Sequence, residues 1–201
     1  MNRIILSIVV ISIMSTLAFA GGDIDEAEVI PEASSGRFYA GLGIVAGSVR
    51  DPDVSVNLWQ TGPGQERLGA VSFIAGYNFN AYIAVEGRYN DSFTHDDQIE
   101  MNSWSLFVKP QYPVSEDFSV YALLGYGGLD LSGSLLSAEP PIPVVDVDNT
   151  TFQWGIGMSY RVMENVSLFV DYVWLSNSID DVNNVYQLSV DAFTIGVNYQ
   201  F

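Results

Sequence analysis

The residue types of a hydrolytic site occur together once in the sequence, around its single histidine. Ser92 precedes His95 by three residues, and Asp96 and Asp97 follow it directly. Serine, histidine and aspartate form the triads of serine hydrolases, but a triad assembles in space from separate elements. Neighbours within one polar segment do not provide that geometry. We therefore interpret His95 as an exposed loop residue and predict that the chain is not an enzyme.

No other pattern in the sequence indicates a cofactor or a metal site. The segment 41–47 (GLGIVAG) is rich in glycine, but its spacing differs from that of a dinucleotide-binding loop and no helix is expected after it. The sequence contains no cysteine, which excludes thiolate zinc ligands and a cysteine nucleophile. We expect no bound cofactor.

A second group of charged residues lies within segments that otherwise alternate between apolar residues and small or polar ones. Their positions place them on the small, polar face. If these segments are the strands of a narrow barrel and this face lies inside it, a lone charge there would be unfavourable, and pairing offsets the desolvation. We predict a salt-bridge and hydrogen-bond plug, with a small or gated pore as the alternative. Alternation predicts the face of the strand on which a residue lies but not its height along the barrel axis. The ion pairs therefore stay unassigned among Glu86, Arg88, Lys109, Arg161 and Asp171.

The segments that position these charges have a period of two. From 193 to 201, and again from 152 to 161, every second residue is apolar and the residues between are small or polar. This pattern predicts a strand with one apolar face, and about ten residues suffice for a tilted strand to cross a bilayer. The pattern predicts eight strands, at roughly 37–49, 67–79, 82–91, 101–112, 117–129, 151–162, 165–176 and 188–201.

The connections between these segments alternate in length. Residues 80–81, 113–116 and 163–164 form short turns, whereas 50–66, 92–100, 130–150 and 177–187 are longer and polar. Short turns at one end and long loops at the other are typical of outer-membrane barrels. The predicted fold is all-β, an eight-stranded antiparallel up-and-down transmembrane β-barrel. An even strand number places both termini at the short-turn end.

A soluble barrel of the lipocalin type is the structural alternative, because alternation does not say which face lies inside. Such a barrel points its large apolar residues inward around a ligand. The membrane version is favoured because the other face carries Gly, Ser and Asn, which suit a narrow, filled interior. Aromatic residues also gather at the strand ends, where the membrane interfaces would lie. They include Tyr112, Tyr160, Trp174 and the last residue, Phe201.

The composition agrees with such a barrel. The chain has 201 residues with 7 Lys+Arg against 24 Asp+Glu, a net charge of −17. So few basic residues exclude a nucleic-acid-binding surface, and 48% hydrophobic residues argue against disorder. The acids concentrate in the long connections, where weak binding of divalent cations is a hypothesis and solvated loops are the alternative.

The N-terminal segment 1–20 is predicted to be a secretory signal peptide. Arg3 precedes an apolar stretch, and Ala18 and Ala20 form a small-x-small cleavage site. Residues 21–35 lack a strand pattern and are expected to form an acidic periplasmic leader before a barrel at 36–201. No later window holds 18 consecutive apolar residues, which excludes a helical membrane protein.

Several segments resemble the transmembrane domain of the outer membrane protein A family. Residues 67–93 (RLGAVSFIAGYNFNAYIAVEGRYNDSF) resemble its second and third strands, and 109–113 (KPQYP), 120–125, 171–174 and 196–201 (GVNYQF) follow in order. The resemblance implies an eight-stranded barrel that the barrel-assembly machinery inserts after recognising a C-terminal aromatic strand. In this sequence that signal comprises Phe193, Ile195, Val197, Tyr199 and Phe201.

The sequence also departs from that family. Its best-known members carry a peptidoglycan-binding domain after the barrel, and we expect none here because the sequence ends at Phe201. Glu86 and Lys109 match two members of the family's internal ion-pair cluster. Ser159 and Phe169 stand where an acid and an arginine would be expected, so the family's gating arrangement is altered at two positions.

Taken together, these features predict a protein of the Gram-negative outer membrane with periplasmic termini. Its expected role is structural or surface-interactive, because loops on a rigid barrel are where recognition residues lie. The alternative is a small, weakly conducting or gated pore. The expected partners are outer-membrane lipid, lipopolysaccharide and the barrel-assembly machinery. No nucleic acid is expected, and the sequence does not identify an extracellular ligand.

Overall fold

The computed structural model describes residues 36–50, 65–93, 100–135, 142–180 and 187–201, which all belong to one compact unit. The predicted signal peptide with Ala18 and Ala20, the leader at 21–35, and His95 lie outside the described residues. Within the described residues, no helix has the length and apolar character needed to cross a membrane.

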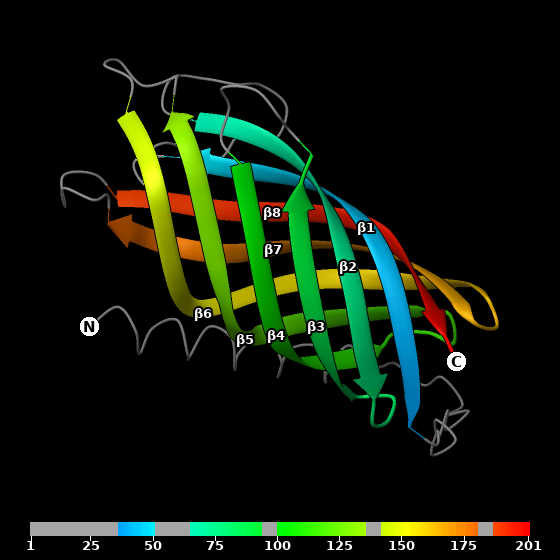
Figure 1. The fold of residues 1–201 in the computed structure, drawn as a ribbon. Coiled ribbons are helices and arrows are strands. Elements are labelled where there is room, and N and C mark those ends of the chain that lie inside the picture. Colours follow the sequence, from blue (N-terminus) through cyan, green and yellow to red (C-terminus); the bar gives the residue numbers. More distant parts are fainter. Residues whose placement is uncertain (1–35, 51–64, 94–99, 136–141, 181–186) are drawn as a thin grey trace, which may run out of the picture. The chain divides into compact units, whose positions relative to one another are not determined.

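Eight antiparallel strands follow one another around a closed barrel (Figure 1). Strand β8 pairs with β1 from Tyr39↔Gln200 to Arg50↔Ser189 and closes the ring. The predicted fold class and strand number are therefore confirmed. The strands are β1 (Arg37–Arg50), β2 (Gln65–Asn78), β3 (Ile83–Ser92), β4 (Glu100–Pro113), β5 (Phe118–Leu135), β6 (Ile142–Met163), β7 (Val166–Asp180) and β8 (Gln187–Gln200).

Polar side chains close two of the short turns. Asn80 Oδ1 accepts hydrogen bonds from the backbone N–H groups of Tyr82 and Ile83, at 2.8 and 3.0 Å. Ser115 Oγ accepts one from the backbone N–H of Phe118, at 3.1 Å. Asparagine and serine favour such turns because their side chains replace a backbone acceptor. These turns lie at the end of the barrel called here the short-turn end; the opposite end is the long-loop end.

The main difference from the prediction is the connection at 130–150, for which the sequence predicts a loop. Strands β5 and β6 instead continue into it and pair as far as Leu135↔Ile142, with a bulge between Leu131 and Gly133. Residues 142–147 (IPVVDV) are rich in β-branched residues, which favour strands. The polar and proline residues around them are typical of loops, so the sequence pattern does not indicate a strand there. Figure 1 shows β5 and β6 diverging from β7 and β8 at the long-loop end.

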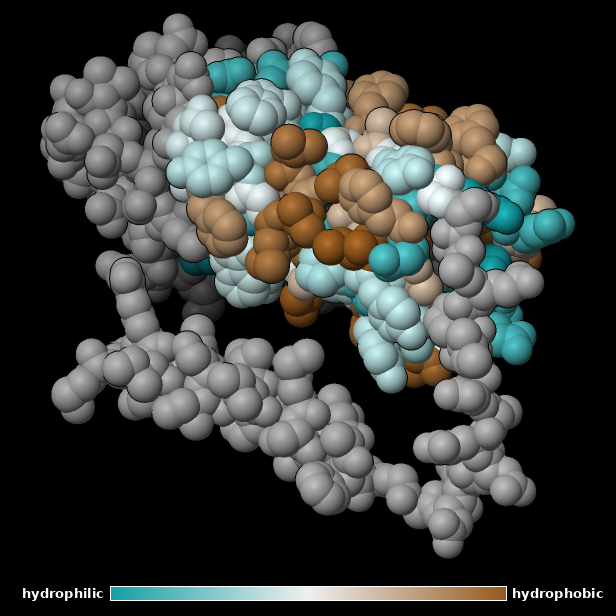
Figure 2. Space-filling model, turned by 90° about the horizontal axis from the view of Figure 1, so that it is seen from below, coloured by the Kyte–Doolittle hydropathy of each residue, from teal (hydrophilic) through white to brown (hydrophobic). Residues whose placement is uncertain are grey.

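The large apolar side chains point outward. Along β6, Phe152, Ile156 and Tyr160 are exposed, whereas Gln153 between them is buried. Figure 2 shows apolar side chains gathered on the outer surface of the strands. A soluble barrel would hold these side chains inside, so their direction favours the membrane version.

The lumen is filled by side chains. Two clusters of buried apolar residues lie in it, one of them containing Tyr39, Ile74, Ala84 and Phe169. The larger cluster includes residues near the long-loop ends of the strands: Val49, Leu68, Met101, Leu129, Leu131 and Val190. Charged side chains occupy the space between the walls.

Candidate functional site: a charge cluster in the lumen

Glu86 on β3 forms the first half of the cluster. Its Oε2 accepts hydrogen bonds from Lys109 Nζ at 2.8 Å and from the Tyr39 hydroxyl at 2.5 Å. Its Oε1 accepts one from Arg88 Nε at 2.6 Å. Glu86 and Arg88 share a face because they lie two residues apart on one strand. One carboxylate therefore joins β1, β3 and β4 inside the barrel.

Arg88 connects this half to Asp171 on β7. Its Nη1 and Nη2 donate to Asp171 Oδ1 and Oδ2 at 3.0 and 2.7 Å, which is a bidentate pair. The Tyr121 hydroxyl donates to Asp171 Oδ2 at 2.8 Å. Every oxygen of the two carboxylates thus accepts at least one hydrogen bond.

The cluster is buried and electrically balanced. The side chains of Glu86 and Asp171 are fully buried, and those of Arg88 and Lys109 are exposed by only 3% and 6%. Two acids face two bases, so pairing offsets the desolvation of each charge. Aromatic rings add to this, because Lys109 Nζ lies 4.1 Å from the centre of the Tyr121 ring.

Small residues make room for these long side chains. A Cβ atom on Gly157 would lie 2.6 Å from Asp171 Cβ, so only glycine fits opposite that aspartate. A Cβ atom on Gly196 would lie 2.6 Å from Phe169 Cζ and even closer to the backbone carbonyl oxygen of Leu42. The glycines of the predicted small, polar face thus allow Asp171 and Phe169 to fill a narrow lumen.

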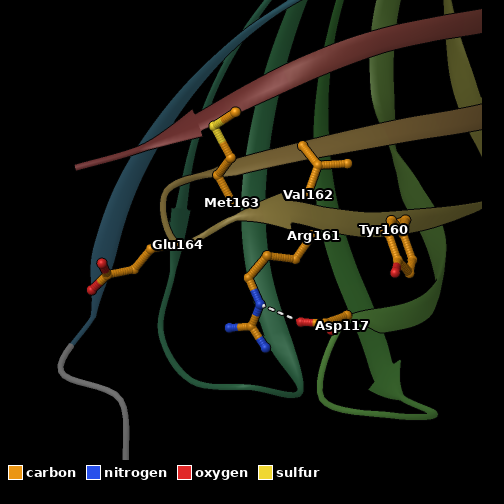
Figure 3. A pocket seen from close by; sticks show the side chains of 6 residues that line it. All are labelled: Asp117, Tyr160, Arg161, Val162, Met163 and Glu164. Carbon is orange, nitrogen blue, oxygen red and sulfur yellow. Dashed lines mark hydrogen bonds and ion pairs between the residues drawn. The ribbon is translucent and has the colours of Figure 1, made fainter.

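The structure places four of the five predicted charges together and corrects the fifth. Arg161 lies at the short-turn end of β6, where 47% of its side chain is exposed, and its Nε pairs with Asp117 Oδ1 at 3.1 Å (Figure 3). It also donates to the backbone carbonyl of Glu116. Alternation assigns Arg161 to the same face as the cluster, but its height along the strand places it at the rim.

Sequence reasoning missed Tyr39 and Tyr121, whose hydroxyls complete the cluster. Both fall on the small, polar face by alternation, and an aromatic residue on that face was the available signal. It also missed an ion pair between Arg50 Nε on β1 and Asp191 Oδ2 on β8, at 3.0 Å. This pair spans the junction that closes the barrel and could be found only from the register of two strands far apart in sequence.

Polar residues line the wall beside the cluster. Asn90 donates to Ser103 Oγ at 2.9 Å, and Ser105 donates to Gln153 Oε1 at 2.5 Å. The larger apolar cluster follows toward the long loops. The lumen therefore holds paired charges, hydrogen-bonded polar residues and apolar residues.

The predicted C-terminal signal lies on β8 and just after it. Ile195, Val197 and Tyr199 point outward, and the Tyr199 ring contacts that of Phe201 edge-on with centroids 5.2 Å apart. The backbone N–H of Phe201 donates to the carbonyl of Phe38 at 2.9 Å. Recognition of this strand by the assembly machinery stays a prediction.

The side chains of the acids predicted to bind cations lie outside the part of the chain that the structure describes, so that hypothesis also stays a prediction. These acids include Asp51, Asp53, Asp96, Asp97, Glu100, Asp146, Asp148, Asp180 and Asp181.

A closed ring of eight antiparallel strands with an apolar exterior and a charge-filled interior defines a transmembrane β-barrel of the outer membrane. The chain belongs to the family described as "Outer membrane protein beta-barrel domain", which it matches over residues 6–201. The expected family and the Gram-negative outer membrane location are thereby confirmed. The family is one of non-enzymatic barrels.

Individual relatives have low sequence identity to this chain. The chain is 28% identical over 136 residues to the virulence membrane protein PagC of Salmonella typhimurium, covering 65% of this chain and 69% of that protein. It is 23% identical over 125 residues to outer membrane protein X of Escherichia coli, covering 62% and 61%.

Solved structures show the same fold. Ail, the attachment invasion locus protein of Yersinia pestis, superposes with a TM-score of 0.54 at 18% identity, covering 83% of this chain and 99% of Ail. Neisserial surface protein A gives a TM-score of 0.52, also at 18% identity, covering 82% and 97%.

Proposed function

We propose that this protein presents an interaction surface outside the cell on a barrel whose lumen is closed by side chains. The observation that carries the proposal is the buried charge cluster, in which Arg88 and Asp171 join opposite walls. A permeating ion would have to displace buried, paired charges, which is energetically unfavourable. A structural or surface-interaction role is therefore better supported than transport. The small, weakly conducting or gated pore is the alternative.

The β5–β6 hairpin supports a role in surface interaction. Pairing of β5 with β4 extends only to Glu100↔Ser132, and pairing of β6 with β7 only to Trp154↔Trp174. Among the described residues, the backbone of 142–153 therefore has no strand partner on its β7 side. An unpaired strand edge accepts an extended segment of another protein by backbone hydrogen bonding. This edge is the surface that we propose for a protein partner.

The charge of the connecting segments indicates the kind of partner. Ail was solved in complex with the heparin analogue sucrose octasulfate. In the present sequence, however, the segments 51–64, 94–99, 130–150 and 181–186 contain acids and no Lys or Arg. A polyanion would be repelled, so a neutral or basic partner is favoured.

Weak binding of Ca²⁺ or Mg²⁺ between acidic loops and lipopolysaccharide phosphates belongs to the same proposal, and an unchanged melting temperature in millimolar Ca²⁺ would count against it.

The proposal includes the segments outside the described residues. Residues 1–20 act as a signal peptide removed after Ala20, and residues 21–35 form an acidic periplasmic leader. Both termini of the barrel then lie in the periplasm and the long loops outside the cell. N-terminal sequencing of the protein from the membrane fraction tests the cleavage position.

Two measurements test the function. Planar-bilayer recordings of the purified barrel are expected to show no reproducible channels, and reproducible channels would support the pore alternative instead. A non-adherent Gram-negative strain that displays the protein is expected to gain adhesion to cultured epithelial cells. Val144→Pro in β6 is expected to abolish that gain because proline removes a backbone donor, whereas Val120→Ala, on the outer face near the short-turn end, serves as the control. Equal adhesion with and without the protein would refute the surface role.

A further inference from the structure

A groove of about 520 Å³ lies at the short-turn rim, where the turn after β6 lies close to the start of β5 (Figure 3). Asp117 lines it from the β5 side, and the last residues of β6 line it together with Glu164 of the following turn. The aromatic residues Tyr112, Tyr160 and Tyr199 are exposed at this end of the barrel. Such residues mark the level of lipid headgroups.

The groove combines one base with two acids. Arg161 uses Nε for Asp117 and Nη2 for the Glu116 carbonyl, while its Nη1 has no hydrogen-bond partner among the described residues. Glu164 is exposed and forms no ion pair with any described residue. The groove therefore offers a donor for one anionic group and a separate acceptor for one cationic group.

An apolar surface leads into the groove from the lipid-facing side. Strand β6 has an irregularity between Arg161 and Met163. Strict alternation would turn Met163 away from the face of Val162, yet both are exposed, Met163 by 69%. In Figure 3 they point away from the Arg161–Asp117 pair. Together with Met158 and Tyr160 they continue the outward apolar row of β6, along which acyl chains would lie.

We propose that this groove binds the headgroup of a phospholipid that carries a primary amine, with the phosphodiester on Arg161 and the ammonium group on Glu164. An arginine is a preferred donor to phosphate oxygens, and a carboxylate accepts from an ammonium group. A choline headgroup lacks N–H donors for Glu164. A glycerol headgroup leaves the lipid anionic, and the groove already holds two acids against one base. Of these three headgroups, ethanolamine alone offers a phosphodiester to Arg161 and an ammonium N–H to Glu164 without a net negative charge. This proposal does not depend on the proposed surface role.

The test compares three lipids with identical acyl chains. The full-length mature protein is reconstituted in nanodiscs that contain equal amounts of phosphatidylethanolamine, phosphatidylcholine and phosphatidylglycerol, then extracted in mild detergent and analysed by native mass spectrometry. Phosphatidylethanolamine is expected to be retained about two- to five-fold more than either other lipid, the factor that one exposed charge pair provides. Heat-modifiable gel migration verifies that each variant is folded.

Two variants assign the contacts. Glu164→Gln is expected to remove the preference for phosphatidylethanolamine over phosphatidylcholine, and Arg161→Gln to lower the retention of both. Arg37→Gln changes an arginine at the start of β1, at the same end but outside the groove, and is expected to bind like the unchanged protein. Equal retention of the three lipids, or an unchanged preference in Glu164→Gln, would overturn the proposal. Either result would leave the closed lumen unaffected.

Discussion

Arg88 and Asp171 form a bidentate ion pair across the full width of the barrel, with N–O distances of 3.0 and 2.7 Å. Arg88 lies on β3 and Asp171 on β7, and three strands separate them in either direction around the ring. A pair between diametrically opposite strands resists both opening of the lumen and slippage of one wall against the other. The closure of this barrel therefore depends on charged side chains as well as on backbone pairing.

Asp171→Asn is expected to destabilise the barrel by about 3–5 kcal/mol, because it leaves a buried arginine without its bidentate partner. Replacing both partners, as in Arg88→Met with Asp171→Leu, is expected to be less harmful, since Glu86 and Lys109 still balance each other. Urea unfolding of the refolded protein, followed by tryptophan fluorescence, measures both. Asp117→Asn removes an exposed pair and should change stability by at most about 1 kcal/mol. An equal effect of Asp171→Asn and Asp117→Asn would contradict the role of the buried pair.

Loss of the charge cluster alone is not expected to open a pore. The apolar cluster near the long-loop ends, which includes Met101 and Leu131, fills the lumen beyond the charges. Arg88→Ala should therefore show no reproducible channels in planar bilayers, because apolar constrictions resist wetting. Adding Met101→Ser and Leu131→Ser to Arg88→Ala should produce conductance. Reproducible channels in Arg88→Ala alone would show that only the charge cluster keeps the lumen closed to ions.

Gly196→Ala is expected to lower the free energy of unfolding by about 1–3 kcal/mol, the usual effect of overpacking. A Cβ atom there would lie 2.6 Å from Phe169 Cζ and even closer to the backbone carbonyl oxygen of Leu42. Phe169→Leu should relieve only the part of the effect that comes from the ring, because the Leu42 carbonyl oxygen stays in place. Gly87→Ala is the matched control, since its nearest neighbour would be the Ala75 carbonyl oxygen at 3.8 Å. Urea unfolding compares the variants, and equal effects of the two alanines would contradict the packing argument.

The strands could be predicted from sequence because burial alternates with a period of two, and that pattern also identified the face on which the charges lie. The positions along that face could not be predicted. Arg161 and Asp171 share a face, yet one lies at the rim and the other at the centre, because height depends on strand tilt and register. The β5–β6 extension was missed because its polar residues resemble those of a loop, while backbone pairing continues through them.

The Arg50–Asp191 pair yields a prediction about barrel closure. The pair joins β1 to β8, the two strands farthest apart in sequence, and the Asp191 side chain is exposed by only 1%. Arg50→Gln should destabilise the barrel by about 3 kcal/mol, because a buried carboxylate loses its charged partner. Arg67→Gln, at the long-loop end of β2, is the comparison on a different strand pair. If Arg50→Gln is as stable as the unchanged protein in urea unfolding, the Arg50–Asp191 pair has no role in closing the ring.

The last residue allows assembly to be separated from stability. Phe201 is 71% exposed and contacts Tyr199 on the outer side of the barrel, so its removal leaves the lumen unchanged. Phe201→Ala should alter the unfolding free energy of refolded protein by less than about 1 kcal/mol. In cells it should lower the heat-modifiable fraction strongly, if the assembly machinery recognises this aromatic residue. Phe38→Ala removes a ring of similar exposure, 67%, from the first strand at the same end and should assemble normally. Equal loss of folded protein in both variants would show that the C-terminal phenylalanine acts through general interface packing and not as an assembly signal.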